Sequence, residues 1–163
     1  MRHGEGTILL IGYGNPGRQD DGLGPALAGA VERMAIAGVT VEAAYQLSVE
    51  DAAAVAEHDV VVLADAARCG PSVFSFGRIE PEVRSSFSSH SVSPGALLGL
   101  AEELFGAKTN GYLLGIRGYA FDAFGEWLSP ASARNLAAAV AFIEPVLRER
   151  RWVTDGEVHE RAR

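Results

Sequence analysis

The sequence predicts an α/β fold, a three-layer α/β/α sandwich with a mostly parallel sheet of five strands between two layers of helices. Short, continuous apolar runs such as residues 60–64 are typical of central strands that are buried on both faces. These runs alternate with stretches of helical periodicity, and such alternation favours parallel strands joined by right-handed crossovers. The 163 residues are 48% hydrophobic and 21% charged, so we expect a single domain over residues 1–163 with its own core.

The first half of the chain has the order strand, helix, strand, helix, strand. We expect these elements at residues 7–13, 23–37, 40–44, 49–56 and 60–64. Leu23, Leu27 and Val31 recur at helical spacing, and Gly38 follows as a stop signal. The strand at 7–13 is apolar throughout and ends in a glycine-rich loop, which favours a central position in the sheet.

The second half contributes two strands and two helices. Strands are expected at residues 73–78 and 111–117, and the direction of the first stays open because no helix clearly separates it from the strand before it. Helices at about 94–105 and 130–150 each follow a Ser-Pro pair, which puts a hydroxyl at the N-cap and a proline at the first helical position. Residues 7–150 should form the ordered core, and the charged tail at 151–163 should fray.

The composition excludes several classes of protein. Lys and Arg number 14 and Asp and Glu number 21, so the net charge is 14 − 21 = −7. No long basic run appears outside the final tail, so nucleic acid is a poor candidate for a partner. Cys69 is the only cysteine, so an intrachain disulfide is impossible and the cytoplasm is the expected compartment. No apolar run reaches the length of a membrane span. We also expect a monomer.

Three residues that can bind a metal each fall in a loop that we expect to leave the carboxyl end of a strand. They are Asp21, Asp65 and His90. Open parallel sheets form their binding crevice at this edge, where residues distant in the sequence converge. The placement therefore predicts a metal-dependent hydrolytic site.

Each candidate also has a structural explanation. Asp65 ends a strand, where aspartate often caps a turn, and His90 stands among serines as a solvated surface histidine would. Asp20 is expected to be structural and to accept backbone hydrogen bonds in the glycine-rich loop or near the start of the first helix. Asn15 is expected to tie the same loop through its side-chain amide. Only the joint pattern favours a site.

Two other readings of the first loop are weaker. Residues 12–17 satisfy G-x-G-x-x-G after a strand, but several polar residues precede the helix, and Asp20 and Asp21 would repel a pyrophosphate. The same residues resemble the opening of bacterial peptidyl-tRNA hydrolases, whose motif continues with a histidine that this chain lacks there. A cysteine protease built on Cys69 and His90 lacks an identified group that would depress the thiol pKa.

Four separated motifs point to another family. They are residues 8–15 with 20–24 (Ile-Leu-Leu-Ile-Gly-Tyr-Gly-Asn and Asp-Asp-Gly-Leu-Gly), 61–66 (Val-Val-Leu-Ala-Asp-Ala), 89–94 (Ser-His-Ser-Val-Ser-Pro), and 115–116 with 128–130. In this order they resemble the nickel-iron hydrogenase maturation endopeptidases over nearly the whole chain. The resemblance implies a flavodoxin-like, phosphorylase/hydrolase-like sandwich.

Position by position, the metal-contacting residues of that family fall on Asp21, Asp65 and His90. The resemblance implies an endopeptidase that removes the C-terminal extension of a hydrogenase large-subunit precursor. Nickel already inserted in the precursor would be what the peptidase recognises, so the protein need hold no metal of its own, and another divalent ion such as zinc is the alternative. Gly14 and Asn15 would border the cleft. A non-catalytic nickel-sensing or chaperone module on the same scaffold is the competing hypothesis.

One segment departs from the family pattern. Many members carry a glycine-rich loop of the Asp-Gly-Gly-Thr type after the second strand, whereas residues 43–48 here read Ala-Ala-Tyr-Gln-Leu-Ser. Tyr45 and Gln46 are expected to narrow or re-aim the cleft, which leaves the identity of the hydrogenase open.

Overall fold

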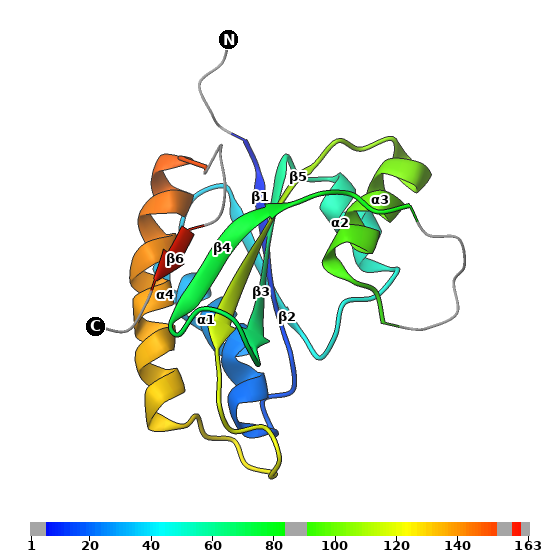
Figure 1. The fold of residues 1–163 in the computed structure, drawn as a ribbon. Coiled ribbons are helices and arrows are strands. Elements are labelled where there is room, and N and C mark those ends of the chain that lie inside the picture. The colour runs from blue at the N-terminus through cyan, green and yellow to red at the C-terminus, as the bar shows by residue number, and fades with distance from the viewer. Residues whose placement is uncertain (1–5, 84–90, 153–157, 161–163) are drawn as a thin grey trace.

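The computed structural model describes residues 6–83, 91–152 and 158–160 (Figure 1). The strands are β1 (Ile8–Tyr13), β2 (Val39–Ala44), β3 (Val60–Ala67), β4 (Phe74–Ile79), β5 (Asn110–Arg117) and β6 (Val158–Glu160), and the helices are the short 3-10 helix η1 (Gln19–Gly22), α1 (Leu23–Met34), α2 (Asp51–Ala56), α3 (Pro94–Phe105) and α4 (Pro130–Glu149). Every strand and α-helix predicted from the sequence is present, whereas η1 and β6 were not predicted.

The strands form one mixed sheet in the order β2-β1-β3-β5-β4-β6. β1, β2, β3 and β5 are parallel, and β4 is antiparallel to β5. This confirms the predicted α/β class with a mostly parallel sheet. β6 extends the sheet by three residues and pairs antiparallel with β4, so the expectation of a frayed tail was wrong for Val158–Glu160. The outer edge of β4 would otherwise leave its backbone groups unpaired, and such an edge readily accepts another strand.

The direction of β4, which the sequence left open, follows from its connection. Only residues 68–73 separate the end of β3 from the start of β4. A parallel return requires a crossover of a dozen or more residues. β4 therefore enters the sheet antiparallel, beyond β5.

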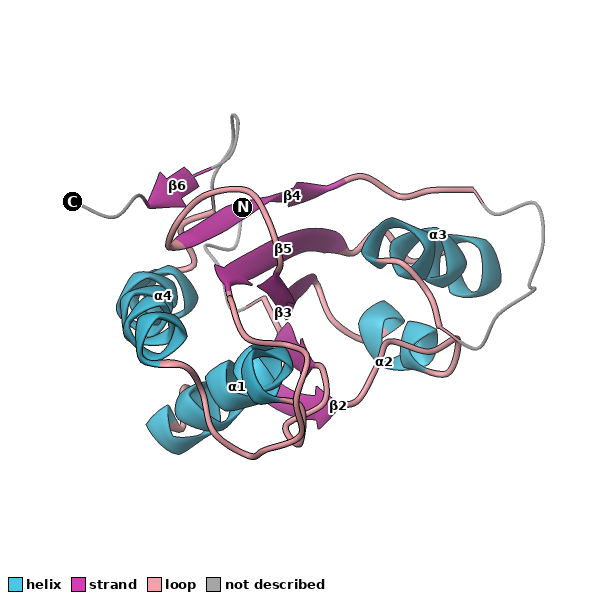
Figure 2. Cartoon of the chain, turned by 60° about the horizontal axis from the view of Figure 1, so that its bottom comes forward, coloured by secondary structure: helices cyan, strands magenta, loops and turns pink. Residues whose placement is uncertain are grey.

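Helices cover both faces of the sheet, α1 and α4 on one face and α2 and α3 on the other (Figure 2). Alternate residues of β1 point to opposite faces, with Ile8 and Leu10 in the cluster beneath α1 and α4, and Leu9 and Ile11 in the cluster beneath α2 and α3. All four side chains are at most 1% exposed. Because both faces are covered, the strand sequence is continuously apolar rather than alternating.

The two Ser-Pro helix starts are confirmed. The hydroxyl oxygen of Ser93 accepts the backbone N–H of Ala96 at 3.2 Å, and that of Ser129 accepts the backbone N–H of Ser132 at 3.4 Å. α1 ends at Met34, earlier than expected, because Ala35 adopts a left-handed backbone conformation (φ 48°). Within the described ranges, no helix combines the length and the apolar character needed to cross a bilayer.

Two glycines allow α1 to lie directly against the centre of the sheet. A Cβ at Gly24, in the first turn of α1, would overlap two backbone oxygens. One belongs to Tyr13, the last residue of β1, and the other to Ala64 in β3. A Cβ at Gly12 would in turn overlap the carbonyl oxygen of Gly24. This close approach fixes the start of α1, and with it η1, against the carboxyl ends of the two central strands.

Candidate functional site

The topology places a crevice at the carboxyl end of β1. From β1 the chain crosses through α1 to β2 on one side and then returns through α2 to β3 on the other side. Open α/β sheets bind ligands at such a reversal of strand order, outside the carboxyl ends of the strands. Residues 14–22, including η1, occupy this edge.

Asp21 lies in η1 and is held by the loop that precedes it. Its Oδ2 accepts the backbone N–H of Asn15 at 2.8 Å. The side-chain oxygen of Asn15 accepts the backbone N–H of Gly17 at 2.9 Å, which confirms that Asn15 ties the loop. Gly14 has a φ of 139° and packs so closely on Asp21 that a Cβ would overlap the Asp21 carbonyl oxygen. Only glycine fits this position.

Asp65 lies on β3, the neighbour of β1 on the side opposite β2. It lies within β3, not in a loop after it as we had expected, because the pairing of β3 with β5 continues to Ala67 and Arg117. Its Oδ1 accepts the backbone N–H of Ala66 at 2.8 Å, and its carboxylate also hydrogen-bonds to the hydroxyl of Tyr13, at the end of β1.

The surroundings of Asp65 raise its pKa to about 6. Burial is the largest cause, and the negative charge of Asp21 raises the pKa further. The Ala66 N–H, the Tyr13 hydroxyl and the charge of Arg68 act in the opposite direction. Burial and the neighbouring Asp65 also raise the pKa of the Tyr13 hydroxyl, so Tyr13 stays protonated and can donate to Asp65. The structure thus brings Asp21 and Asp65 within electrostatic range of each other.

The predicted third member of the site, His90, lies outside the described residues. In the part of the chain that is described, no group of three histidine, cysteine, aspartate or glutamate side chains could hold a metal ion. The segment after His90 is placed: the N–H of Val92 donates to the carbonyl of Leu47, after β2, at 3.2 Å. The chain therefore reaches the carboxyl edge of the sheet two residues beyond His90.

Asp20 is structural, as predicted, but its partners are not those we expected. It is fully buried, and its donors lie about 100 residues away, in the segment between β5 and α4 and in the first turn of α4. They are the backbone N–H groups of Tyr119, Ala120 and Ser129 and the hydroxyls of Ser129 and Ser132, at 2.7–2.9 Å.

These hydrogen bonds control the charge of Asp20. Burial raises its pKa, but the Ser132 hydroxyl and the three backbone N–H groups outweigh this effect and lower the pKa to about 2. Asp20 is therefore a carboxylate at neutral pH, and it fastens η1 to the start of α4. Because Asp21 is the next residue in η1, this anchor also fixes the position of Asp21.

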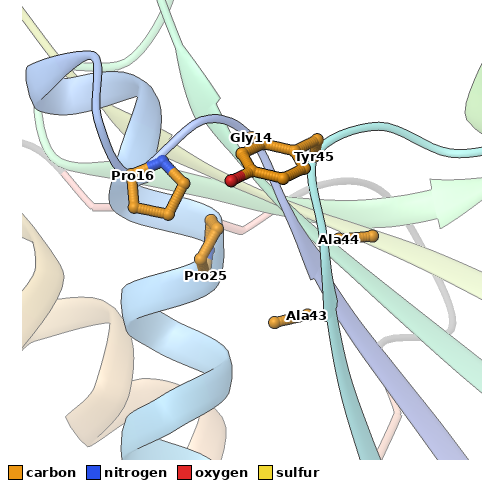
Figure 3. Close-up of a pocket in the computed structure, with 6 residues that line it drawn as sticks. All are labelled: Gly14, Pro16, Pro25, Ala43, Ala44 and Tyr45. Carbon is orange, nitrogen blue, oxygen red and sulfur yellow. The ribbon is translucent and has the colours of Figure 1, made fainter. Parts of the chain in front are cut away.

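The two predicted residues of the loop after β2 lie differently. Tyr45 lines a pocket of about 200 Å³ together with Gly14, Pro16, Pro25, Ala43 and Ala44 (Figure 3). Gln46 is exposed and is not among the residues that line this pocket. Tyr13 is a site residue that the sequence reasoning missed. Its position at the carboxyl end of β1, the edge where open parallel sheets form their crevice, was the available signal.

No protein-family model matches the chain, and no curated protein matches it significantly. Several solved structures match this chain over most of their own length and most of its length. The NiFe hydrogenase maturation protease HycI from Thermococcus kodakarensis KOD1 is 20% identical with a TM-score of 0.69, and the match covers 90% of this chain and 95% of that one.

Two further solved structures have a similar fold. The hydrogenase maturating endopeptidase HybD from E. coli is 24% identical with a TM-score of 0.65, over 88% of this chain and 93% of that one. The hydrogenase 2 maturation peptidase from Thaumarchaeota archaeon SCGC_AB-539-E09 is 19% identical with a TM-score of 0.64, over 88% and 99%. At these identities the likeness concerns the fold, and we conclude that this chain has the fold of the hydrogenase maturation proteases.

Proposed function

We propose that this protein is an endopeptidase that removes the C-terminal extension of a nickel-loaded hydrogenase large-subunit precursor. The observation that carries the proposal is that Asp21 lies close enough to Asp65, at the reversal of strand order, for its charge to raise the pKa of Asp65. The fold is one whose solved examples include the named hydrogenase maturation proteases. Fold alone does not determine function, so the proposal depends on this pair of carboxylates and on the four sequence motifs.

Asp21 and Asp65 would supply two carboxylates to a metal ion that arrives with the substrate. The raised pKa of Asp65 arises in part from the charge of Asp21, so a cation between the two side chains would relieve their repulsion. Nickel carried by the precursor would supply that cation and polarise the peptide carbonyl for attack by water.

His90 is proposed as the third contact to this ion. In the sequence His90 stands two residues before Val92. Val92 is hydrogen-bonded to the loop after β2, at the same edge of the sheet as Asp21. An imidazole and two carboxylates suit nickel or zinc and leave coordination positions for substrate groups.

The remaining side chains of the site position these groups. Asn15 orients Asp21 through its backbone N–H, and Tyr13 orients Asp65 through its hydroxyl. Asp20 holds η1 from behind. The protein is proposed to act in the cytoplasm, where a free, exposed thiol such as Cys69 stays reduced.

The deciding experiment compares nickel-loaded with nickel-free precursor. Each form is incubated with the purified protein, and the intact mass of the precursor is measured over time. The proposal expects a shortened product from the nickel-loaded form only. The competing hypothesis, a non-catalytic nickel-sensing or chaperone module, expects a complex with the nickel-loaded precursor and an unchanged mass.

A further inference from the structure

A small apolar pocket opens beside the candidate site, between the carboxyl end of β2 and the first turn of α1. It has a volume of about 200 Å³. Pockets that hold cofactors or drug-sized ligands usually enclose about 300–1,000 Å³. This pocket is therefore the right size for one side chain rather than for a cofactor.

The pocket exists because the side chains of β2 become smaller toward its end. Val39 and Val41 pack against the core on the α1 face of the sheet, and the next residue on that face is Ala43. Pro25, in the first turn of α1, lines the opposite wall and offers no backbone N–H to the space. A larger residue at position 43 would fill the pocket from the side of β2.

Tyr45 forms the outer wall of the pocket. Its side chain extends toward Pro16 and Pro25 in Figure 3, and the residue is 75% exposed. An aromatic ring offers a large apolar surface at a low cost in conformational entropy, which is why exposed aromatic residues beside apolar hollows are typical of binding surfaces.

The pocket borders the candidate site at Gly14. This residue lines the pocket, and a Cβ built on it would lie 3.7 Å from Cγ of Asp21. β2 is also an edge strand in the described sheet, so an extended peptide can hydrogen-bond along it and turn alternate side chains toward the α1 face. A side chain in the pocket would thus belong to a residue near the bond that is cut.

We propose that this pocket receives one aliphatic or aromatic side chain of the precursor segment next to the cleaved bond, with Ala43 setting its depth and Tyr45 covering it. This inference rests on the proposed endopeptidase function and adds its substrate preference. Gly14 connects the pocket to Asp21, so occupation of the pocket aligns the peptide with the carboxylates.

The first test measures binding without cleavage. The ¹⁵N-labelled protein is titrated with N-acetyl-leucinamide or N-acetyl-serinamide, and the backbone NMR signals of Gly14, Ala43 and Tyr45 are followed. The leucine amide should shift these signals and the serine amide should not. Ala43→Leu should weaken binding of the leucine amide about tenfold or more, since a filled pocket excludes the whole side chain. The matched control, Ala137→Leu on an exposed position of α4, should bind like the wild type.

A second pair of variants tests the outer wall. Tyr45→Ala should weaken binding of the leucine amide, and Tyr45→Phe should retain it, because the ring and not the hydroxyl contacts the ligand. Tyr45 is exposed, so both variants should fold. They therefore test the pocket even if Ala43→Leu fails to fold. Equal binding by all variants would overturn the proposal.

The last test uses the nickel-loaded precursor. Residues on either side of the cleaved bond are replaced by alanine one at a time. The residue whose side chain binds in the pocket is the one whose replacement raises KM most. Ala43→Leu should lower kcat/KM on the natural precursor, chiefly through KM, and lose less on the alanine variant. If the probe binds but no precursor is cut, the endopeptidase proposal fails while the apolar pocket stands. If the precursor is cut equally well by wild type and Ala43→Leu, the pocket proposal is overturned and the endopeptidase stands.

Discussion

Asp20→Asn removes the charge from a fully buried carboxylate that accepts five hydrogen bonds. If the asparagine oxygen replaces Oδ2, it retains the Tyr119 and Ala120 N–H groups, and its NH₂ group then faces the Ser129 N–H and the Ser132 hydroxyl. The hydroxyl can turn to accept, but the Ser129 N–H cannot. One buried backbone donor therefore loses its partner, which costs about 1–3 kcal/mol.

The pKa of Asp20 gives a second measure of the same effect. The pKa falls from 3.8 to about 2, which corresponds to roughly 2 kcal/mol of stability at neutral pH. The two figures overlap and are not added. We expect Asp20→Asn to lower the free energy of unfolding by about 2–3 kcal/mol at pH 7.

The sign of the pH dependence is fixed by the lowered pKa. A carboxyl group whose pKa is lower in the folded state stabilises the protein above its unfolded pKa and loses that contribution as the pH falls through its folded pKa. The difference between wild type and Asp20→Asn should therefore be constant above about pH 5 and shrink by roughly 2 kcal/mol between pH 4 and pH 2.

Urea unfolding at a series of pH values measures this difference. Asp122→Asn, at an exposed position in the same segment between β5 and α4, is the control and should change stability by less than about 0.5 kcal/mol. The reasoning is refuted if Asp20→Asn matches this control at pH 7, or if its loss of stability is the same at pH 2.

Three further predictions concern the site and the sheet. Asp21→Asn should lower the pKa of Asp65 from about 6 but leave it above the usual value, because burial is the larger cause of the raised pKa. Tyr13→Phe should raise the pKa of Asp65, because it removes the hydroxyl that stabilises the carboxylate. Side-chain NMR titration measures both changes. Asp65→Asn should stabilise the protein at pH 7 by about 1 kcal/mol or more, because a carboxyl group with a raised pKa is destabilising once it ionises; a stability equal to wild type at pH 7, with no gain relative to pH 4, would contradict this. Gly24→Ala should prevent or severely weaken folding because its Cβ would overlap two backbone oxygens, whereas Gly29→Ala in the same helix meets only ordinary contacts and should be neutral or stabilising by up to about 1 kcal/mol in thermal unfolding.

Local patterns in the sequence predicted the elements of the fold because local chemistry determines them. The apolar run of β1, the helical spacing of α1 and the two Ser-Pro caps each depend on residues within one element. The extent of β3 was underestimated, since its last residues are added by pairing with β5, a contact that no local pattern encodes. β6 was missed for the same reason: three residues of a charged tail form a strand only because the edge of β4 is available.

The site was predictable only in part. The convergence of Asp21 and Asp65 follows from the βαβ order, because parallel strands end at one edge of the sheet. The partners of Asp20 were not predictable, since its hydrogen bonds join residues 99–112 positions apart. The link between Tyr13 and Asp65 required the register of β1 against β3. The prediction for His90 concerns a residue outside the described ranges and remains a prediction.

The most direct test of the account follows the intact mass of a nickel-loaded large-subunit precursor during incubation with wild type, Asp21→Asn, Asp65→Asn and His90→Ala. The account predicts a shortened product with the wild type. It also predicts that each variant cleaves more than about 100-fold more slowly, a larger loss than is typical of residues that merely support a metal ligand. The thermal stability of each variant should fall by no more than about 1 kcal/mol relative to the wild type. Normal trimming by Asp21→Asn or Asp65→Asn would contradict the central claim that these two carboxylates meet to carry the reaction.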